Sequence, residues 1–399
     1  MIPRFRPPVD SGALFEVLRP GRRDAVRRYE TAFARSVGMQ YAVAFGYGRT
    51  AIRCFLESNE IYDREVVLPS YSCVVVAHAV MASGNRPVFV DSKPDDPNMD
   101  LDVAIEAITK ETAVVIPTSL FGRPVDLRKI REIRRRRPDV LVLQDCCHSF
   151  GVSGHGQSVQ EEGDAAVFAL NFSKITTSVF GGMLTTNDPE MFRRFRDWRE
   201  EHCTRSGFRR SMRRRAYVTA ALPVFWSPVY GVTNWLINLG ILDRFVRYFD
   251  ESTIEMPPDH REDMSCFEAQ VGLRSLQQVQ DRIAERRQAA AIYIEKLGEF
   301  LDIDPGDLSE ATFSHFILRH PDPASFIEAG RRQSVEYGRI VDYSIPDLPS
   351  YRRLGHGSSP YAVAHAKSMV NLPVAVSTRE AERIASVTLE ILRALDTTR

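Results

Sequence analysis

The sequence has no net charge and few cysteines, and both absences narrow what the protein can be. Its 52 lysines and arginines balance its 52 aspartates and glutamates, so no overall positive field draws the chain to nucleic acid. The six cysteines include no CxxC pair, and two of them, Cys146 and Cys147, are neighbours, which is a poor geometry for a disulfide. This usage favours a reduced, cytoplasmic compartment.

Long hydrophobic runs are also scarce. The segment Met1 to Arg6 lacks the apolar stretch of a signal peptide, so none is expected. The exception is the 27-residue run 216–242, which has no charged residue and directly follows six arginines within 205–215. We interpret 205–260 as an insertion.

The charge-free run leaves three interpretations open. It is long enough to span a bilayer, although prolines, glycines and asparagines interrupt it. A basic segment beside an aromatic-rich apolar one suits an element that rests on an anionic membrane, here 205–245 on the inner membrane face. The third interpretation is a buried insertion or a pair of helices at a dimer interface.

The pattern between 50 and 185 is typical of an α/β fold. Apolar runs alternate with helical stretches, which predicts a mostly parallel sheet with helices on both faces and a ligand site at the carboxyl ends of the strands. The expected strands are 66–68, 87–90, 112–116, 140–144, 165–170 and 183–185, and the expected helices lie near 50–58, 73–83, 101–109 and 126–136.

Two charged residues follow such strands directly. Lys174 comes after the run 165–170, and Asp145 ends the run 140–144. Upstream, Gly46 to Ala51 is a flexible turn that opens a helix. Most lysines at strand ends are surface residues, but a desolvated one suits Schiff-base chemistry. A lysine, an aspartate and such a turn are the three parts of a pyridoxal phosphate (PLP) site. The lysine binds the aldehyde of the cofactor, the aspartate at the strand end binds its ring nitrogen, and the glycine-rich start of the helix binds its phosphate.

The order and spacing of these motifs resemble the DegT/StrS sugar aminotransferases, which are fold-type I PLP enzymes. The resemblance covers about residues 40–200 and 262–396. Its points are Gly48-Arg49-Thr50-Ala51, Leu68-Pro69-Ser70-Tyr71, Pro87-Val88-Phe89-Val90-Asp91, Phe121-Gly122-Arg123-Pro124-Val125-Asp126, Asp145-Cys146-Cys147-His148, Lys174, Gly181-Gly182 and Met264-Ser265.

The resemblance implies a role for each residue of the site. Lys174 binds the cofactor and moves the proton during catalysis, and lysine implies transamination because related dehydratases carry histidine there. Asp145 pairs with the ring nitrogen, although an aspartate after a strand can also cap a helix. His148 lies near the phenolic oxygen, with a histidine at the edge of the core as the alternative. The phosphate-binding turn consists of Gly48, Arg49 and Thr50, and Arg49 replaces a small residue and adds a charge.

Several positions depart from the family pattern at the cofactor. Cys73 stands where the family places an aromatic side chain over the ring, and Tyr71 is the alternative residue for stacking. Ala169 replaces a phosphate-binding serine, for which Asn171 or Ser173 is the expected substitute.

Two further departures concern the substrate and the dimer. Ser119 replaces a histidine before the Phe-Gly turn. Arg261-Glu262-Asp263 replace an Asn-Tyr-Arg sequence that reaches the partner's phosphate across the family's dimer. The phosphate site, the cross-dimer contact and the substrate class are therefore open.

The domain boundaries follow from the same patterns. We expect an N-terminal arm (1–40, with a helix over 23–37) packed on a large PLP-binding domain (41–262). A long connecting helix (263–298) then leads to a small α+β domain (299–399), whose strands lie near 313–318 and 369–374.

The function implied is that of a homodimeric PLP-dependent aminotransferase. It passes an amino group from an amino acid, glutamate, to a keto-sugar that is linked to a nucleotide or, given the apolar insertion, to a lipid. Two alternatives stay open: another PLP reaction, such as dehydration or condensation on a lipid or acyl substrate, and a regulatory homologue without catalysis.

Overall fold

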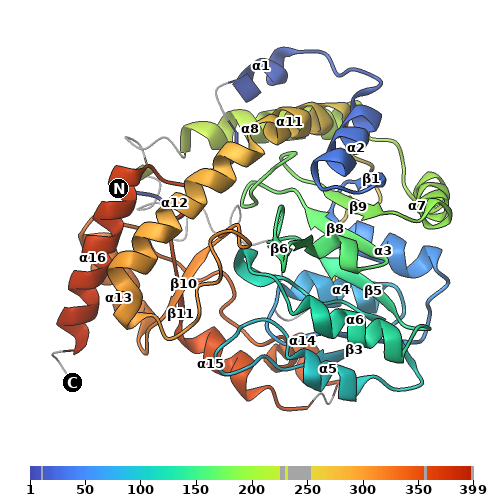
Figure 1. Ribbon diagram of the computed structural model, residues 1–399. Helices are drawn as coiled ribbons and strands as arrows, with labels where there is room; N and C mark the ends of the chain where they lie inside the picture. Colours follow the sequence, from blue (N-terminus) through green and yellow to red (C-terminus); the bar gives the residue numbers. More distant parts are fainter. Residues whose placement is uncertain (10–11, 225–229, 232–252, 355–356, 397–399) are drawn as a thin grey trace.

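The large domain is built around a seven-stranded sheet (Figure 1). The computed structural model describes residues 1–9, 12–224, 230–231, 253–354 and 357–396. The strands lie in the order β1-β9-β8-β5-β4-β2-β3, and all except β9 run in one direction. Their bounds are β1 Tyr41–Phe45, β2 Glu65–Pro69, β3 Arg86–Val90, β4 Thr112–Val115, β5 Leu141–Asp145, β8 Ala165–Ala169 and β9 Gly182–Thr186.

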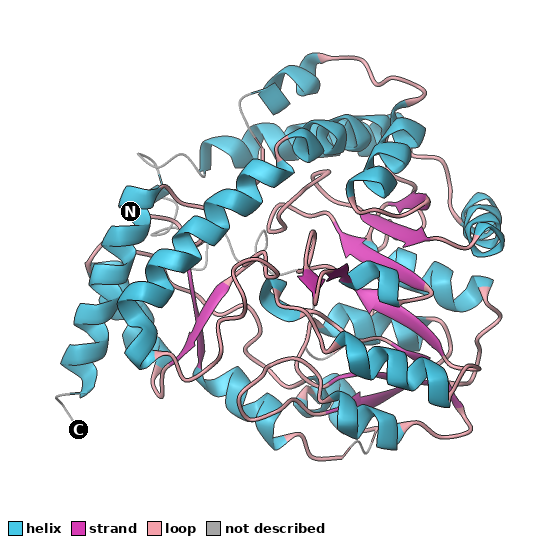
Figure 2. Ribbon diagram, viewed as in Figure 1, coloured by secondary structure: helices cyan, strands magenta, loops and turns pink. Residues whose placement is uncertain are grey.

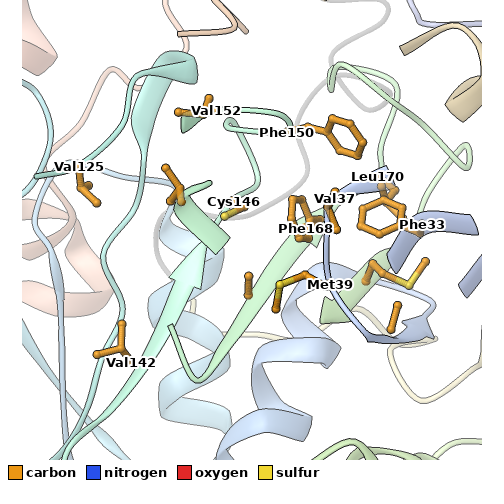
Figure 3. Close-up of a cluster of buried hydrophobic side chains, with 14 of the residues drawn as sticks. Phe33, Val37, Met39, Val125, Val142, Cys146, Phe150, Val152, Phe168 and Leu170 are labelled. Carbon is orange, nitrogen blue, oxygen red and sulfur yellow. The ribbon is translucent and has the colours of Figure 1, made fainter. Parts of the chain in front are cut away.

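Helices cover both faces of this sheet, as Figure 2 shows. One face carries α2, α5 and α6, where Phe33, Phe150 and Phe168 pack edge to face (Figure 3). The opposite face carries α3, α4 and α7, which bury Phe55 and Phe195 against the strands. The expected α/β fold is therefore confirmed. The helices are α2 Ala25–Ser36, α3 Gly48–Ser58, α4 Val74–Ala82, α5 Leu101–Ala107, α6 Leu127–Arg136 and α7 Pro189–His202.

Three details of the sequence-based expectation need correction. β1 was missed, because its five residues form an edge strand that pairs only with β9. The connector at 263–298 is two helices, α11 (Cys266–Gln277) and α12 (Val279–Leu297), since the chain leaves helical geometry at Gln278. β10 begins at Phe316 rather than at 313, because Phe313 has φ 46°.

A smaller domain follows α11. Within it, α12 packs along α16, and β10 pairs antiparallel with β11 around buried Tyr293 and Phe316. The helix α16 starts with a capping box of Ser377 and Glu380. The remaining bounds are β6 Ser153–Gly154, β7 Gln157–Ser158, β10 Phe316–Arg319, α13 Pro323–Arg332, α14 Pro349–Arg352, α15 Pro360–Ser368, β11 Met369–Leu372 and α16 Thr378–Asp396, with short 3-10 turns at Leu120–Gly122, Val159–Glu162, Gly298–Phe300 and Ile345–Asp347.

The N-terminal arm lies on both domains, whereas the sequence suggested the large domain alone. Ile2 N donates to Ser334 O at 2.8 Å, and Arg6 donates two hydrogen bonds to Glu380, all in the small domain. The helix α2 packs on α11 and β1, as expected. The first residues contact the small domain because Ile2 packs in its apolar core and its backbone pairs with that of Val335.

The start of the proposed insertion is helical. The helix α8 (Phe208–Val224) lies along α1 (Gly12–Leu18) and α11 (Figure 1). Residues 225–229 and 232–252 lie outside the described part, so most of the charge-free run is not placed. No helix among the described residues is both long and apolar enough to cross a membrane.

Candidate functional site

A small hollow lies where β5 and β8 end, and Lys174 stands at its side. The turn after β8 is held by backbone contacts, with Lys174 N donating to Asn171 O at 3.2 Å and Leu170 N donating to Gly181 O at 3.0 Å. The hollow is lined by Cys146, Cys147, His148, Phe150, Phe168, Ala169, Leu170, Lys174, Ile175 and Thr176. Lys174 thus lies beside Cys146, Cys147 and His148, the three residues that directly follow Asp145.

Asp145 is a buried carboxylate with fixed orientation. Its side chain accepts from Thr118 Oγ1 at 3.1 Å and from Cys147 N at 3.0 Å, and only 2% of the residue is exposed. Among the described residues, no lysine, arginine or histidine forms an ion pair with it. Because an unpaired buried charge is costly, this carboxylate suits a cationic N–H donor from a ligand.

The charges of Asp145 and Lys174 both affect the pKa of the Cys147 thiol. The pKa of Cys147 lies well above its usual value, chiefly because of burial; Asp145 raises it further, and Lys174 opposes the shift. Cys147 N also donates to Asp145, and Cys147 lines the same hollow as Lys174, so both expected catalytic residues lie beside this cysteine.

Two histidines, one from each domain, complete the surroundings of Lys174. His148 and His315 have ring centroids 5.2 Å apart. The pKa of each imidazole is held well below 6.5, first by burial and next by the nearby charge of Lys174. Both rings are therefore neutral at pH 7. His148 was expected here, whereas His315 was not.

His315 reaches the site because two strained turns meet at the domain junction. Phe121 and Phe313 both have positive φ values, 59° and 46°. Their segments pair directly, with Thr312 N donating to Gly122 O at 2.9 Å. A Cβ on Gly122 would lie 2.6 Å from Ser314 N, so glycine is required for this approach. Such strain persists where surrounding structure enforces it.

The expected phosphate turn lies against the strand ends next to Lys174. Gly182 approaches Gly48 so closely that a Cβ on Gly182 would lie 2.5 Å from Gly48 N. Ala169 is the nearest neighbour of Gly48 on the other side. Thr50 donates through Oγ1 to His260 O at 2.9 Å. The first N–H groups of α3 thus face the edge where Lys174 and Asp145 lie.

Arg49 adds a cation to this helix start. Burial lowers the pKa of Arg49, and the neighbouring Cys73 and Tyr47 side chains oppose this shift. Within the described ranges its guanidinium has no hydrogen bond or ion pair. A cation at a helix N-terminus is unfavourable unless an anion joins it, so this place suits a phosphate.

The remaining predicted residues have other neighbours. Tyr71 is fully buried, and its hydroxyl donates to Val341 O at 3.0 Å. Cys73 occupies the N-cap position of α4, and its side chain forms no capping hydrogen bond there. Ser173 donates through N and Oγ to Asn171 Oδ1, so these two side chains bind each other. The small domain binds the hydroxyl of Tyr71, and the stacking role of its ring stays a prediction.

The residues present fit PLP at three points. The unpaired buried Asp145 suits the ring nitrogen, Lys174 suits the aldehyde carbon, and the start of α3 with Arg49 suits the phosphate. The ring face has no aromatic partner at Cys73. The structure does not assign a phosphate contact to Asn171 or Ser173.

The sequence is also similar to known proteins. A model of the DegT/DnrJ/EryC1/StrS aminotransferase family matches residues 17–390. The dTDP-3-amino-3,4,6-trideoxy-alpha-D-glucose transaminase of Micromonospora megalomicea is 26% identical over 362 residues, which are 88% of this chain and 84% of that protein. The L-glutamine:2-deoxy-scyllo-inosose aminotransferase of Streptomyces kanamyceticus is 30% identical over 200 residues, 47% of each chain.

A solved structure has the same fold. The aminotransferase TlmJ of Streptoalloteichus hindustanus superimposes with a TM-score of 0.77 at 22% identity, covering 99% of this chain and 100% of its own.

Proposed function

Because the chain belongs to the DegT/DnrJ/EryC1/StrS aminotransferase family, and is thus a PLP-dependent aminotransferase, we propose that it aminates a keto-sugar linked to a nucleotide, with glutamate as the amino donor. The observation that carries the proposal is that Lys174 lines the same hollow as Cys147, whose N–H donates to the buried carboxylate of Asp145. The nucleotide-sugar acceptor is inferred from the activities named for the relatives.

The side chains divide the work between them. When bound, PLP supplies an electron sink for the carbon that loses its proton. Asp145, held by Thr118 and Cys147, would pair with the ring nitrogen of bound PLP and keep that nitrogen protonated. Lys174 Nζ takes the proton from the α-carbon of the donor and delivers a proton in the reverse sense to the acceptor carbon. His148 and His315 border the lysine as neutral rings, so they add no competing positive charge.

The experiment that tests the proposal is spectroscopic. Purified protein with PLP should show the band of lysine-bound cofactor, and glutamate should convert it to the amine form. Lys174→Arg keeps the charge and should lose at least about 100-fold in turnover, because proton transfer by a placed side chain contributes that much. A glutamine arm distinguishes the donors, and mass analysis of nucleotide-linked keto-sugars incubated with the loaded enzyme identifies an aminated product.

The negative outcomes separate the alternatives. Bound cofactor that ignores glutamate, glutamine and other amino acids would favour a different PLP reaction. A chain that binds no PLP would favour a regulatory homologue. Amination of no nucleotide-linked sugar, with an intact response to the donor, would reject only the acceptor.

A peripheral membrane site is the second part of the proposal. On α8, Phe208 is 80% exposed and Met212, one turn later, is 45% exposed, while exposed Arg209 and Arg213 share that side of the helix. Apolar side chains beside arginines suit an anionic leaflet and would bring the enzyme to a lipid-linked acceptor.

Vesicle sedimentation tests this membrane contact. The protein should sediment with vesicles containing phosphatidylserine and not with pure phosphatidylcholine, and Phe208→Ser with Met212→Ser should release it. Binding that the double variant retains would assign the contact elsewhere, and a soluble protein that ignores both vesicles would reject it. The expected homodimer is a further proposal, tested by analytical ultracentrifugation.

A further inference from the structure

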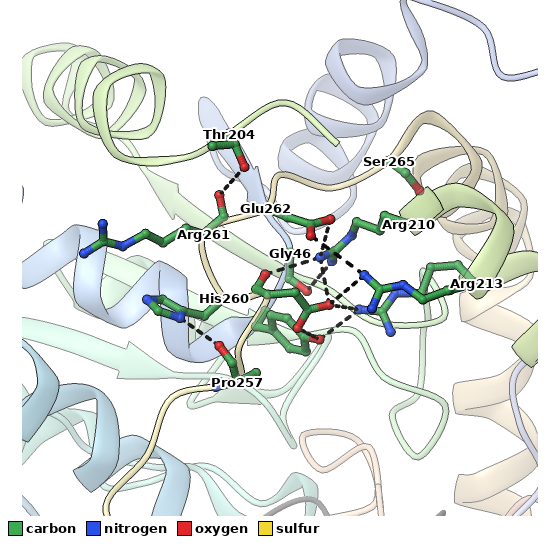
Figure 4. Close-up of polar contacts among 12 residues, drawn as sticks. Gly46, Thr204, Arg210, Arg213, Pro257, His260, Arg261, Glu262 and Ser265 are labelled. Carbon is green, nitrogen blue, oxygen red and sulfur yellow. Dashed lines mark hydrogen bonds and ion pairs between the residues drawn. The ribbon is translucent and has the colours of Figure 1, made fainter. Parts of the chain in front are cut away.

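A cluster of arginines and carboxylates contacts Gly46 and Tyr47, which directly precede the expected phosphate turn (Figure 4). It consists of Arg210 and Arg214 on α8, Tyr47 before α3, Asp259, and Glu268 on α11; we call it the arginine bridge. Three segments far apart in the sequence meet in it. Neither the proposed proton transfer nor the proposed membrane contact uses these groups.

Arg210 links the start of α11 to the turn. Its side chain is completely buried and lies 3.3 Å from Glu268, which is itself completely buried. Its Nη2 donates to Gly46 O at 3.3 Å. Glu268 also accepts from Ser265 N at 2.8 Å as part of the capping box of α11. Arg210 therefore fixes Gly46 relative to a helix whose own start is fixed.

Tyr47 is the point where the bridge meets α3. Its hydroxyl donates to Asp259 Oδ1 at 2.7 Å and accepts from Arg214 Nη2 at 2.9 Å. The guanidinium carbons of Arg210 and Arg214 lie 5.5 and 5.6 Å from its ring centroid. Because Tyr47 is the N-cap of α3, these contacts set the direction in which the first N–H groups of the helix point.

The charges of the bridge are satisfied internally. Arg214 lies 3.1 Å from Glu268 and 3.4 Å from Asp259. The two arginines thus have carboxylate partners, in contrast to Arg49, whose guanidinium has no partner among the described residues. The bridge consequently acts on the turn through geometry, and Arg49 remains the cation available to a phosphate.

Segment 261–263 corresponds to the sequence that contacts the partner subunit in the family it resembles. Here it reads Arg261-Glu262-Asp263, and its backbone forms hydrogen bonds within its own chain. Thr204 N donates to Arg261 O at 2.7 Å, and Asp263 N donates to Thr204 O at 2.9 Å. Directly before it, His260 O accepts from Thr50 Oγ1, on the phosphate turn of the same subunit.

We propose that Tyr47 and Arg214 are positioning residues for the phosphate group of the cofactor, and that the arginine bridge gives this support within one subunit. This support comes from residues of the same chain and does not require a contact across a dimer. The inference concerns cofactor binding and is independent of which sugar, if any, is aminated.

Cofactor titration of the apoprotein tests the proposal. Tyr47→Phe and Arg214→Lys should each weaken PLP affinity about tenfold, the size expected when a charge-assisted contact that orients a binding group is lost. Pyridoxal, which has the same aldehyde and ring but no phosphate, should bind to both variants as it binds to the wild type. The matched control is Arg194→Gln, an exposed arginine on α7, which should change neither affinity.

The outcomes that overturn the proposal are distinct. If both variants bind PLP with wild-type affinity, the arginine bridge stabilises the fold and does not position the phosphate group. Equal weakening of PLP and pyridoxal would show a general effect on the site. PLP affinity that falls on dilution in step with dimer dissociation would show that a partner completes the phosphate site. Thermal unfolding of each apoprotein verifies its folding, and Tyr47→Phe, which removes one oxygen, decides the matter if Arg214→Lys does not fold.

Discussion

The positive charge of Arg49 is in an unfavourable position as long as no anion is bound. Arg49 is a half-buried residue in the first turn of α3, at the positive end of the helix dipole, and its guanidinium has no partner among the described residues. The helix dipole and burial both oppose this charge in the free protein, and a bound phosphate would reverse both effects. Stability and cofactor affinity should therefore respond to Arg49 in opposite directions.

Arg49→Gln should make the apoprotein more stable and the cofactor complex weaker. We expect a gain of about 0.5 kcal/mol in the free energy of unfolding without PLP, the usual size of a charge–dipole interaction. PLP affinity should fall about tenfold, because a charged hydrogen bond to the phosphate is lost. Urea unfolding of the apoprotein and a PLP titration measure the two effects. A loss of stability without PLP would contradict this account.

The neutral histidines make stability depend on pH. In the folded chain the pKa of His315 lies well below 6.5, so the unfolded chain binds protons that the folded chain does not as pH falls below 6.5. Stability is therefore complete above that value and declines below it. His315→Gln should reduce the decline between pH 7.5 and 5.5 by on the order of 1 kcal/mol. Urea unfolding at both pH values measures this, and an unchanged decline would locate the titrating group elsewhere.

Local motifs could be predicted from the sequence, and contacts between distant segments could not. Lys174, Asp145 and Gly48 were found because each follows or opens a regular element whose pattern is visible nearby. His315 was missed because only the domain junction brings it to Lys174. Its signal, one histidine at the start of an apolar run, resembles many that have no such role.

At the level of elements, the contact between α3 and β9 positions the phosphate turn. Gly48 and Gly182 have no side chains to separate the helix start from the strand. The sequence indicated glycine at both places, but β1, the neighbour that holds β9 on its far side, was missed because it is a short edge strand.

Gly182→Ala should disturb both stability and cofactor binding. The new Cβ would lie 2.5 Å from the backbone of Gly48 and Tyr47, so α3 must shift. We expect a loss of about 2 kcal/mol in the free energy of unfolding, typical of overpacking, and a weaker affinity for PLP than for pyridoxal relative to wild type. The control is Gly298→Ala, where a Cβ meets nothing within 4 Å. Equal effects of both substitutions would argue against the close contact.

At the level of the whole molecule, the N-terminal residues join two domains that share the site. Ile2 and Arg6 are bound to the small domain, and Pro8 O accepts from Ser275 on α11. The small domain in turn supplies His315 and the carbonyl that holds Tyr71. The arm therefore contributes to the geometry of the site without touching it.

Removal of residues 1–6 should loosen the small domain selectively. Hydrogen exchange should accelerate at amides near 334–338 and 377–384, since a backbone pairing and a two-bond ion pair are lost, worth on the order of 2 kcal/mol together. Amides in β8 and α3 serve as the internal control and should keep their protection. Uniform acceleration across both domains would contradict a selective role.

The pairing of Ile2 with Val335 also sets an order of events during synthesis. Residues 334–336, which hold the first strand-like contact of the chain, leave the ribosome more than 330 residues after Ile2 does. The seven-stranded sheet, whose strands end at Thr186, can assemble well before that point, whereas the backbone of Ile2 can pair only once residues 334–336 emerge. Contacts of such high sequence separation form late. The contact between the arm and the small domain is therefore among the last of the described contacts that can form during synthesis.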